Sequence, residues 1–87
     1  MPTPLDEAGL LDLLREEIAE VAGIDGSTVG PSANLAEDYD VDSLELMEIA
    51  TRLEDRLGVR LDPADLKDTT TVGDVVGYLG DVLRARA

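Results

Sequence analysis

Three stretches of this chain repeat apolar residues at steps of three and four, the spacing of one buried helix face. The first runs from about residue 4 to residue 22, the second from Ser43 to Leu57, and the third follows Thr71. Gly23 and Gly58 come directly after the first two stretches, where glycine commonly ends a helix. Since 87 residues leave room for one domain only, the sequence predicts a single all-α domain over residues 1–87.

Local capping signals place the helix ends. Thr3-Pro4 and Asp62-Pro63 each join a capping side chain to a proline in the first turn. We therefore expect one helix to begin near residue 4, and a short helix to run from Pro63 to about Lys67. Thr71 with Asp74 three residues later predicts the start of the last helix.

Residues 23 to 41 are rich in glycine and predict a long loop, which is unusual inside a compact domain. Ile24, Val29 and Leu35 are its apolar residues and are expected to reach the core, with a short helical turn near residues 35–38. The sequence thus predicts a small up-and-down bundle of three main helices and one short helix. The termini, residues 1–3 and 85–87, are expected to be disordered.

The composition excludes several function classes. Twenty acidic and seven basic residues give a net charge of −13, which argues against nucleic acid and anionic membranes and favours basic partners. The chain has no His and no Cys, so neither a Ser-His-Asp or Cys-His nucleophile nor a usual zinc site can be assembled. No apolar stretch has the length of a membrane span, and no signal-peptide pattern opens the chain. We expect a cytoplasmic, stand-alone monomer.

One serine lies at the start of the second helical stretch, among acidic residues. Asp42 is a good N-cap, and Glu45 follows at the spacing of a capping box. Ser43 then falls in the first turn, where free N–H groups and the helix dipole favour a phosphate or another anion. Because no base accompanies this hydroxyl, the chemistry expected of Ser43 is that another group becomes attached to it.

The motif Asp42-Ser43-Leu44, followed by an acidic amphipathic helix, resembles the modification site of acyl carrier proteins. Residues 34–44 and 70–79 are also similar to that family, and the resemblance spans about residues 5–83. It implies an acyl-carrier-like fold and a Ser43 that receives 4′-phosphopantetheine from coenzyme A through a phosphopantetheinyl transferase. Asp40 stands where the family often has glycine, but aspartate still tolerates turn conformations.

Within that family, an aspartate directly before the serine favours acyl over peptidyl carriers. Residues 38–48 and 52–59 look most like discrete polyketide carriers of actinobacteria. The resemblance therefore implies a carrier, not an enzyme, that holds acyl or polyketide intermediates as thioesters. Fatty acid synthesis and nonribosomal peptide synthesis remain the alternative pathways.

The second helix also carries a polar stripe. By pattern alone it is a solvated face, because Glu48 and Arg52 have the i, i+4 spacing of a stabilising ion pair. The resemblance implies instead a docking face for ketosynthase, acyltransferase and other synthase enzymes. Leu44 and Met47, at the edge of the apolar stripe, would add apolar contacts. The predicted partner-recognition residues are Asp42, Leu44, Glu45, Met47, Glu48 and Asp55.

Two other interpretations of the acidic motif remain open. Asp38, Asp40 and Asp42 have the spacing that begins an EF-hand calcium loop. That loop needs glycine at its sixth position and glutamate at its twelfth, where this chain has Ser43 and Ile49. No specific metal site is therefore expected, and loose divalent-ion binding by the acidic cluster is the alternative. The second alternative is a non-enzymatic acidic helical adaptor.

Overall fold

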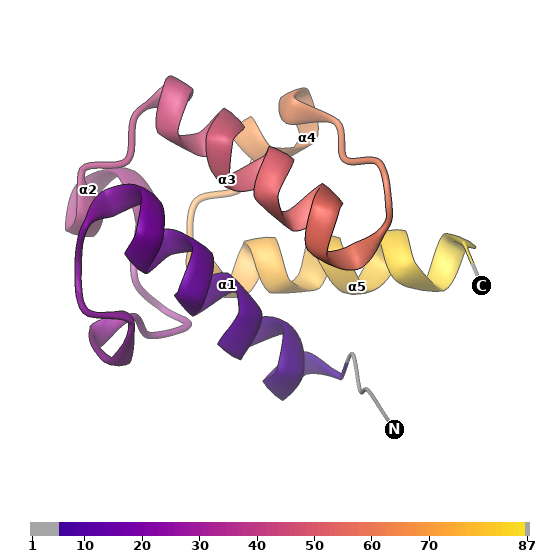
Figure 1. The fold of residues 1–87 in the computed structure, drawn as a ribbon, viewed down its shortest axis with the longest axis horizontal. Coiled ribbons are helices and arrows are strands. Elements are labelled where there is room, and N and C mark those ends of the chain that lie inside the picture. Colours follow the sequence, from indigo (N-terminus) through magenta and orange to yellow (C-terminus); the bar gives the residue numbers. More distant parts are fainter. Residues whose placement is uncertain (1–5, 87) are drawn as a thin grey trace.

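The computed structural model of the protein describes residues 6–86, and its ordered elements are helical (Figure 1). The all-α class, the three long helices and the short helix after Asp62 are confirmed. The helical turn expected near residues 35–38 is also present. In chain order the elements are α1 (Glu7–Ala22), the 3-10 helix η1 (Gly26–Thr28), α2 (Leu35–Tyr39), α3 (Ser43–Leu57), α4 (Pro63–Lys67) and α5 (Val72–Arg86).

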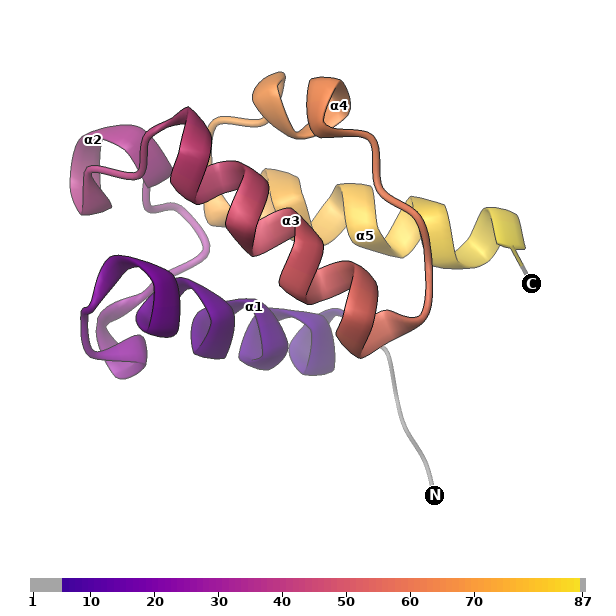
Figure 2. The same cartoon turned by 45° about the horizontal axis from the view of Figure 1, so that its top comes forward.

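The long helix α1 packs against both α3 and α5, and the short α4 packs against α3 (Figure 2). Along the long axis of the molecule, α1 runs in one direction and α3 and α5 run in the other (Figure 1). The link through α4 therefore carries the chain back before α5 begins. This crossover departs from a simple up-and-down order, and it brings the chain that enters α5 close to the start of α3.

The start of the first helix and the end of the last helix differ from those predicted. Asp6, not Thr3, is the N-cap of α1, because its Oδ1 accepts the N–H of Gly9 at 2.8 Å, so the helix begins at Glu7. Aspartate is the stronger of these two caps. The proposed Thr3-Pro4 start lies outside the described residues. At the other end α5 continues to Arg86, so residues 85 and 86 are helical.

The remaining helix ends follow local side-chain chemistry, as predicted. Gly23 and Gly58 end α1 and α3 with left-handed φ angles of 71° and 68°. At the start of α5, Thr71 Oγ1 accepts the N–H of Asp74 at 3.1 Å, and Asp74 Oδ2 accepts the N–H groups of Thr71 and Thr70. The same backbone donors lower the pKa of Asp74, since they stabilise its ionised form.

The core is aliphatic and draws on every long helix and on the first loop. Val29 and Leu35 are buried and Ile24 packs against the core, as predicted for this loop. Since the core contains no phenylalanine or tryptophan, its packing depends on many small contacts between branched side chains. The buried apolar residues are Leu10, Leu14, Ile18, Val29, Leu35, Val41, Ile49, Ala50, Leu53, Leu61, Leu66, Val72, Val75, Val76 and Leu79.

The backbone of the first loop is tied to the start of α5. Asn34 and Thr71 form an isolated antiparallel bridge. A Cβ atom on Gly73 would meet the carbonyl oxygen of Pro31 at 3.0 Å, so glycine permits this close approach. The backbone hydrogen bonds are Leu35 N–H to Thr70 O (3.2 Å), Val72 N–H to Ala33 O (3.0 Å) and Gly73 N–H to Pro31 O (2.7 Å).

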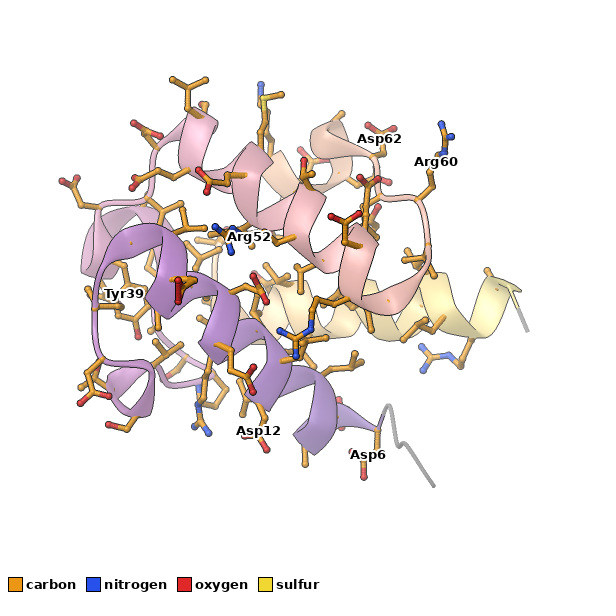
Figure 3. The ribbon with its side chains drawn as sticks, in the orientation of Figure 1. Asp6, Asp12, Tyr39, Arg52, Arg60 and Asp62 are labelled. Carbon is orange, nitrogen blue, oxygen red and sulfur yellow. The ribbon has the colours of Figure 1, made fainter. Side chains whose placement is uncertain are left out.

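A buried carboxylate joins α1 to α3. Glu17 is only 5% exposed, and its Oε2 accepts a hydrogen bond from Arg56 Nη1 at 2.7 Å. Arg52 lies between the two helices in the view of Figure 3, and its Nη1 is 3.6 Å from the other oxygen of Glu17. Arg56 also pairs with the exposed Glu16, and Arg52 with Glu48, both at 3.3 Å. Periodicity alone did not identify Glu17 as a core residue.

Over residues 6–86, none of the helices combines the length and the apolar character that crossing a bilayer requires.

We expect Glu17→Gln to lower the free energy of unfolding by about 1–3 kcal/mol, because it leaves two arginines without their shared buried counter-ion. Urea unfolding followed by circular dichroism measures this. Glu16→Gln is the matched control: Glu16 is one residue away and exposed, and its loss should cost at most about 0.5 kcal/mol. Equal losses in the two variants would contradict a structural role for the Glu17 carboxylate.

Candidate functional site

The start of α3 is fixed by a reciprocal capping box, as predicted. Asp42 Oδ1 accepts the N–H of Glu45 at 2.8 Å, and Glu45 Oε1 accepts the N–H of Asp42 at 3.2 Å. The carbonyl oxygen of Asp42 then accepts the first intrahelical bond, from the N–H of Leu46 at 2.9 Å. These three bonds hold the first turn in one conformation, which sets the direction of every side chain on it.

Ser43 is the first residue of α3, and its side chain is exposed. Within residues 6–86 its hydroxyl has no hydrogen-bond partner. The sequence has no histidine to activate this serine as in a Ser-His pair. The arrangement presents a free hydroxyl on a rigid helix start, where a second protein can reach it.

The turn before this helix depends on an unusual backbone angle at Asp40. Asp40 ends α2 with φ at 57°, in the left-handed region, and its N–H donates to the carbonyl of Leu35. This region favours glycine, and aspartate is among the few other residues that visit it. Aspartate at this position is therefore compatible with the left-handed turn.

A pocket of about 310 Å³ opens beside Ser43, between α2, α3 and the segment that joins α4 to α5. Its wall combines apolar side chains with polar and charged ones, including the lysine at the end of α4. Sequence analysis did not identify residues 67–70 as part of the site, because they lie 24 or more residues from Ser43 in the chain. The lining residues are Asn34, Leu35, Ala36, Glu37, Val41, Asp42, Ser43, Leu46, Lys67, Thr69 and Thr70.

The predicted partner-recognition residues lie along α3 and its N-cap, but they are not equally accessible. Leu44 and Met47 are exposed by 76% and 47%, which is high for large apolar side chains. Glu48 and Asp55 are exposed on the same helix. Glu45 is half-buried, and one of its oxygens is engaged in the capping box, so it is less available to a partner.

The three aspartates of the calcium-loop pattern have separate structural roles. Asp38 Oδ2 accepts the N–H of Asn34 at 2.7 Å, Asp40 ends α2, and Asp42 caps α3. In the part of the chain that the structure describes, no three His, Cys, Asp or Glu side chains gather as a metal site. The α3 helix also begins at the sixth position of the proposed calcium loop, where that loop would still need to turn.

Comparison with known proteins identifies relatives over most of the chain. Residues 12–79 match the family described as "Phosphopantetheine attachment site". The acyl carrier protein of Thermobifida fusca is 41% identical over 73 residues, which cover 84% of this chain and 92% of that protein. The meromycolate extension acyl carrier protein of Mycobacterium tuberculosis is 40% identical over 87% of this chain, and the match spans 66% of its own length.

A solved structure has the same fold. It is a free-standing peptidyl carrier protein from an uncharacterized secondary metabolic pathway of Acinetobacter baumannii, with a TM-score of 0.82. The alignment covers 92% of this chain and 99% of that chain, at 25% sequence identity.

We expect Asp40→Gly to be more stable than Asp40→Ala by about 1 kcal/mol, because only glycine adopts the left-handed turn without strain. Both variants lose the same carboxylate, so the difference between them isolates the backbone requirement. Urea unfolding of the two proteins measures it. If alanine is tolerated as well as glycine, the left-handed angle at residue 40 does not constrain this turn.

Proposed function

The chain belongs to the acyl carrier protein family, and we propose that it carries polyketide intermediates as thioesters on a phosphopantetheine arm attached to Ser43. Carrier proteins of this family bear phosphopantetheine, are not themselves enzymes, and work with synthase enzymes. The observation that carries the assignment to Ser43 is its position. It is an exposed hydroxyl on the first turn of a capped helix, beside a pocket, and residues 6–86 offer it no hydrogen-bond partner.

The residues around Ser43 fit such an arm. An exposed hydroxyl leaves room for a phosphodiester, and the pocket beside it has both polar and apolar walls. A phosphopantetheine arm has the same mixed character, since it joins a phosphate and two amides to short carbon segments. The protein supplies the attachment point and the recognition surface, while the thiol of the arm supplies the reactivity.

Attachment is a phosphoryl transfer that the chain cannot perform alone. The Ser43 oxygen forms a new P–O bond to the phosphopantetheine phosphate of coenzyme A. The pyrophosphate bond breaks, and adenosine 3′,5′-bisphosphate leaves. The hydroxyl proton passes to a base of a Mg²⁺-dependent phosphopantetheinyl transferase, because no histidine or cysteine is available in this chain.

The polyketide pathway is the finer part of the proposal. It is supported by the similarity of residues 38–48 and 52–59 to discrete polyketide carriers. Fatty acyl extension is the second candidate, because a relative that is 40% identical is named for meromycolate extension. Peptidyl loading is a third, on the fold likeness to a peptidyl carrier protein.

Docking is proposed to use the outer face of α3. Leu44 and Met47 are exposed on α3, as are Glu48 and Asp55, so a partner would offer apolar contacts together with basic side chains. Asp42 holds the helix start, and Glu45 contributes through the capping box. The expected partners are the transferase, a ketosynthase, an acyltransferase and further synthase enzymes. Such binding is weak and sensitive to salt.

We expect the purified protein to gain the mass of one phosphopantetheine when incubated with coenzyme A, Mg²⁺ and a broad-specificity phosphopantetheinyl transferase. Ser43→Ala should gain none, because it lacks the oxygen that forms the phosphodiester. Intact-protein mass spectrometry measures both. Thr51→Ala is the matched control: it removes another exposed α3 hydroxyl and should leave modification unchanged.

A folded wild-type protein that stays unmodified would overturn the carrier assignment and favour an acidic adaptor. If the Ser43→Ala variant is still modified, phosphopantetheine is attached to another residue. If the modified protein accepts malonyl groups from a polyketide acyltransferase, the polyketide pathway is supported. If only fatty acyl or aminoacyl enzymes load the modified protein, the polyketide assignment is wrong and the corresponding pathway takes its place.

We expect Glu48→Lys to slow transfer between the modified protein and a synthase enzyme by about tenfold at low salt, equivalent to about 1.4 kcal/mol. The physical reason is that the variant places a positive charge opposite a basic partner. Raising the salt concentration should narrow the difference. Single-turnover acyl transfer measures the rate, and circular dichroism shows that the variant folds.

Glu20→Lys is the control, because it makes the same charge change on an exposed position of α1. Its transfer rate should stay close to that of the wild type. Equal slowing in the two variants would mean that net charge alone matters, and that α3 is not the docking face.

A further inference from the structure

We propose that Lys67 is the counter-ion of the phosphodiester on Ser43 and holds the base of the arm in the pocket between α2, α3 and the α4–α5 segment. This inference rests on the proposed attachment to Ser43. It adds a residue of this chain that orients the attached group, at the far end of the short helix α4.

The position of the phosphate follows from its connectivity. In a phosphodiester on Ser43 the phosphorus is bonded directly to the serine oxygen. The phosphate must therefore lie at the mouth of the pocket that Ser43 lines. Lys67, the last residue of α4, lines the same pocket. A lysine side chain is long and flexible, and its ammonium donates three hydrogen bonds, which suits a phosphate.

The negative charge around Ser43 favours such a counter-ion. Among the described residues that line the pocket, Lys67 is the one cation, and Glu37 and Asp42 are carboxylates. The whole chain has a net charge of −13. Besides the N–H groups of the first turn of α3, Lys67 is then the positively charged group of this lining that can pair with the added phosphate.

The other described cations near the core are already engaged. Arg15 donates to the carbonyl of Val29 at 2.7 Å and pairs with Asp12. Arg52 and Arg56 both pair with carboxylates of α1. Lys67 has no ion pair within residues 6–86, so it can pair with a new anion without breaking an existing contact.

Arg60 provides a matched comparison. It is exposed on the link that follows α3, where Figure 3 labels it, and within residues 6–86 it has no ion pair. It lines a different pocket, with Met47, Thr51 and Asp55. A variant at Arg60 therefore removes the same single positive charge at a place that does not adjoin Ser43.

The test uses nuclear magnetic resonance of the protein before and after modification. Because the chain has one lysine, labelling lysine with ¹⁵N at Nζ gives a single side-chain ammonium signal. We expect this signal to move when phosphopantetheine is attached. We also expect the ³¹P signal of the phosphodiester to move in Lys67→Gln, to return towards the wild-type position in Lys67→Arg, and to stay in place in Arg60→Gln.

Intact mass is measured first on every sample, which separates this inference from the proposed function. A protein that cannot be modified overturns both. A modified protein whose Lys67 signal stays unchanged overturns the counter-ion role alone. The same ³¹P shift in Lys67→Gln and Arg60→Gln would also overturn it, because net charge would then explain the result. An equal movement of the Lys67 signal when equimolar inorganic phosphate is added to the unmodified protein would contradict a role specific to the attached arm.

Discussion

The pairing of the first loop with the start of α5 is the constraint on which the site depends. The loop between α1 and α3 is long, and a loop of this length rarely keeps one shape unless other parts of the fold hold it. Here three backbone hydrogen bonds join residues 31–35 to residues 70–73. Val29 and Leu35 add buried side chains on the same segment. The loop therefore enters α2 and α3 from a fixed direction.

That pairing also explains why a pocket lies beside Ser43. The crossover through α4 brings residues 67–70 to the start of α5, and the loop pairing holds them beside α2. The capping box of Asp42 and Glu45 then places Ser43 on the rim of the pocket. Ser43, the proposed attachment point, is thus fixed on its own helix, while the walls of the pocket come from segments that are distant in sequence.

The two sides of α3 perform separate tasks. Its inner side buries Ile49, Ala50 and Leu53 and reaches the buried carboxylate of α1 through Arg52 and Arg56. Its outer side leaves large apolar and acidic side chains in solvent. A helix held firmly from within can present such an outer face at little cost in stability. This division is what the proposed docking face on α3 requires.

The sequence by itself determined the helices and the position of the serine. Capping and apolar periodicity act over three or four residues, so the bounds of α3 and α4, the caps at Asp42, Asp62 and Thr71, and the exposed edge of α3 could be predicted. The competing cap at Asp6 was missed because Thr3-Pro4 offers a similar local signal.

The tertiary structure alone decided the burial of Glu17, the loop pairing and the place of Lys67 beside Ser43. Each of these joins residues 24 or more positions apart, and no local pattern in the chain specifies which distant partners meet.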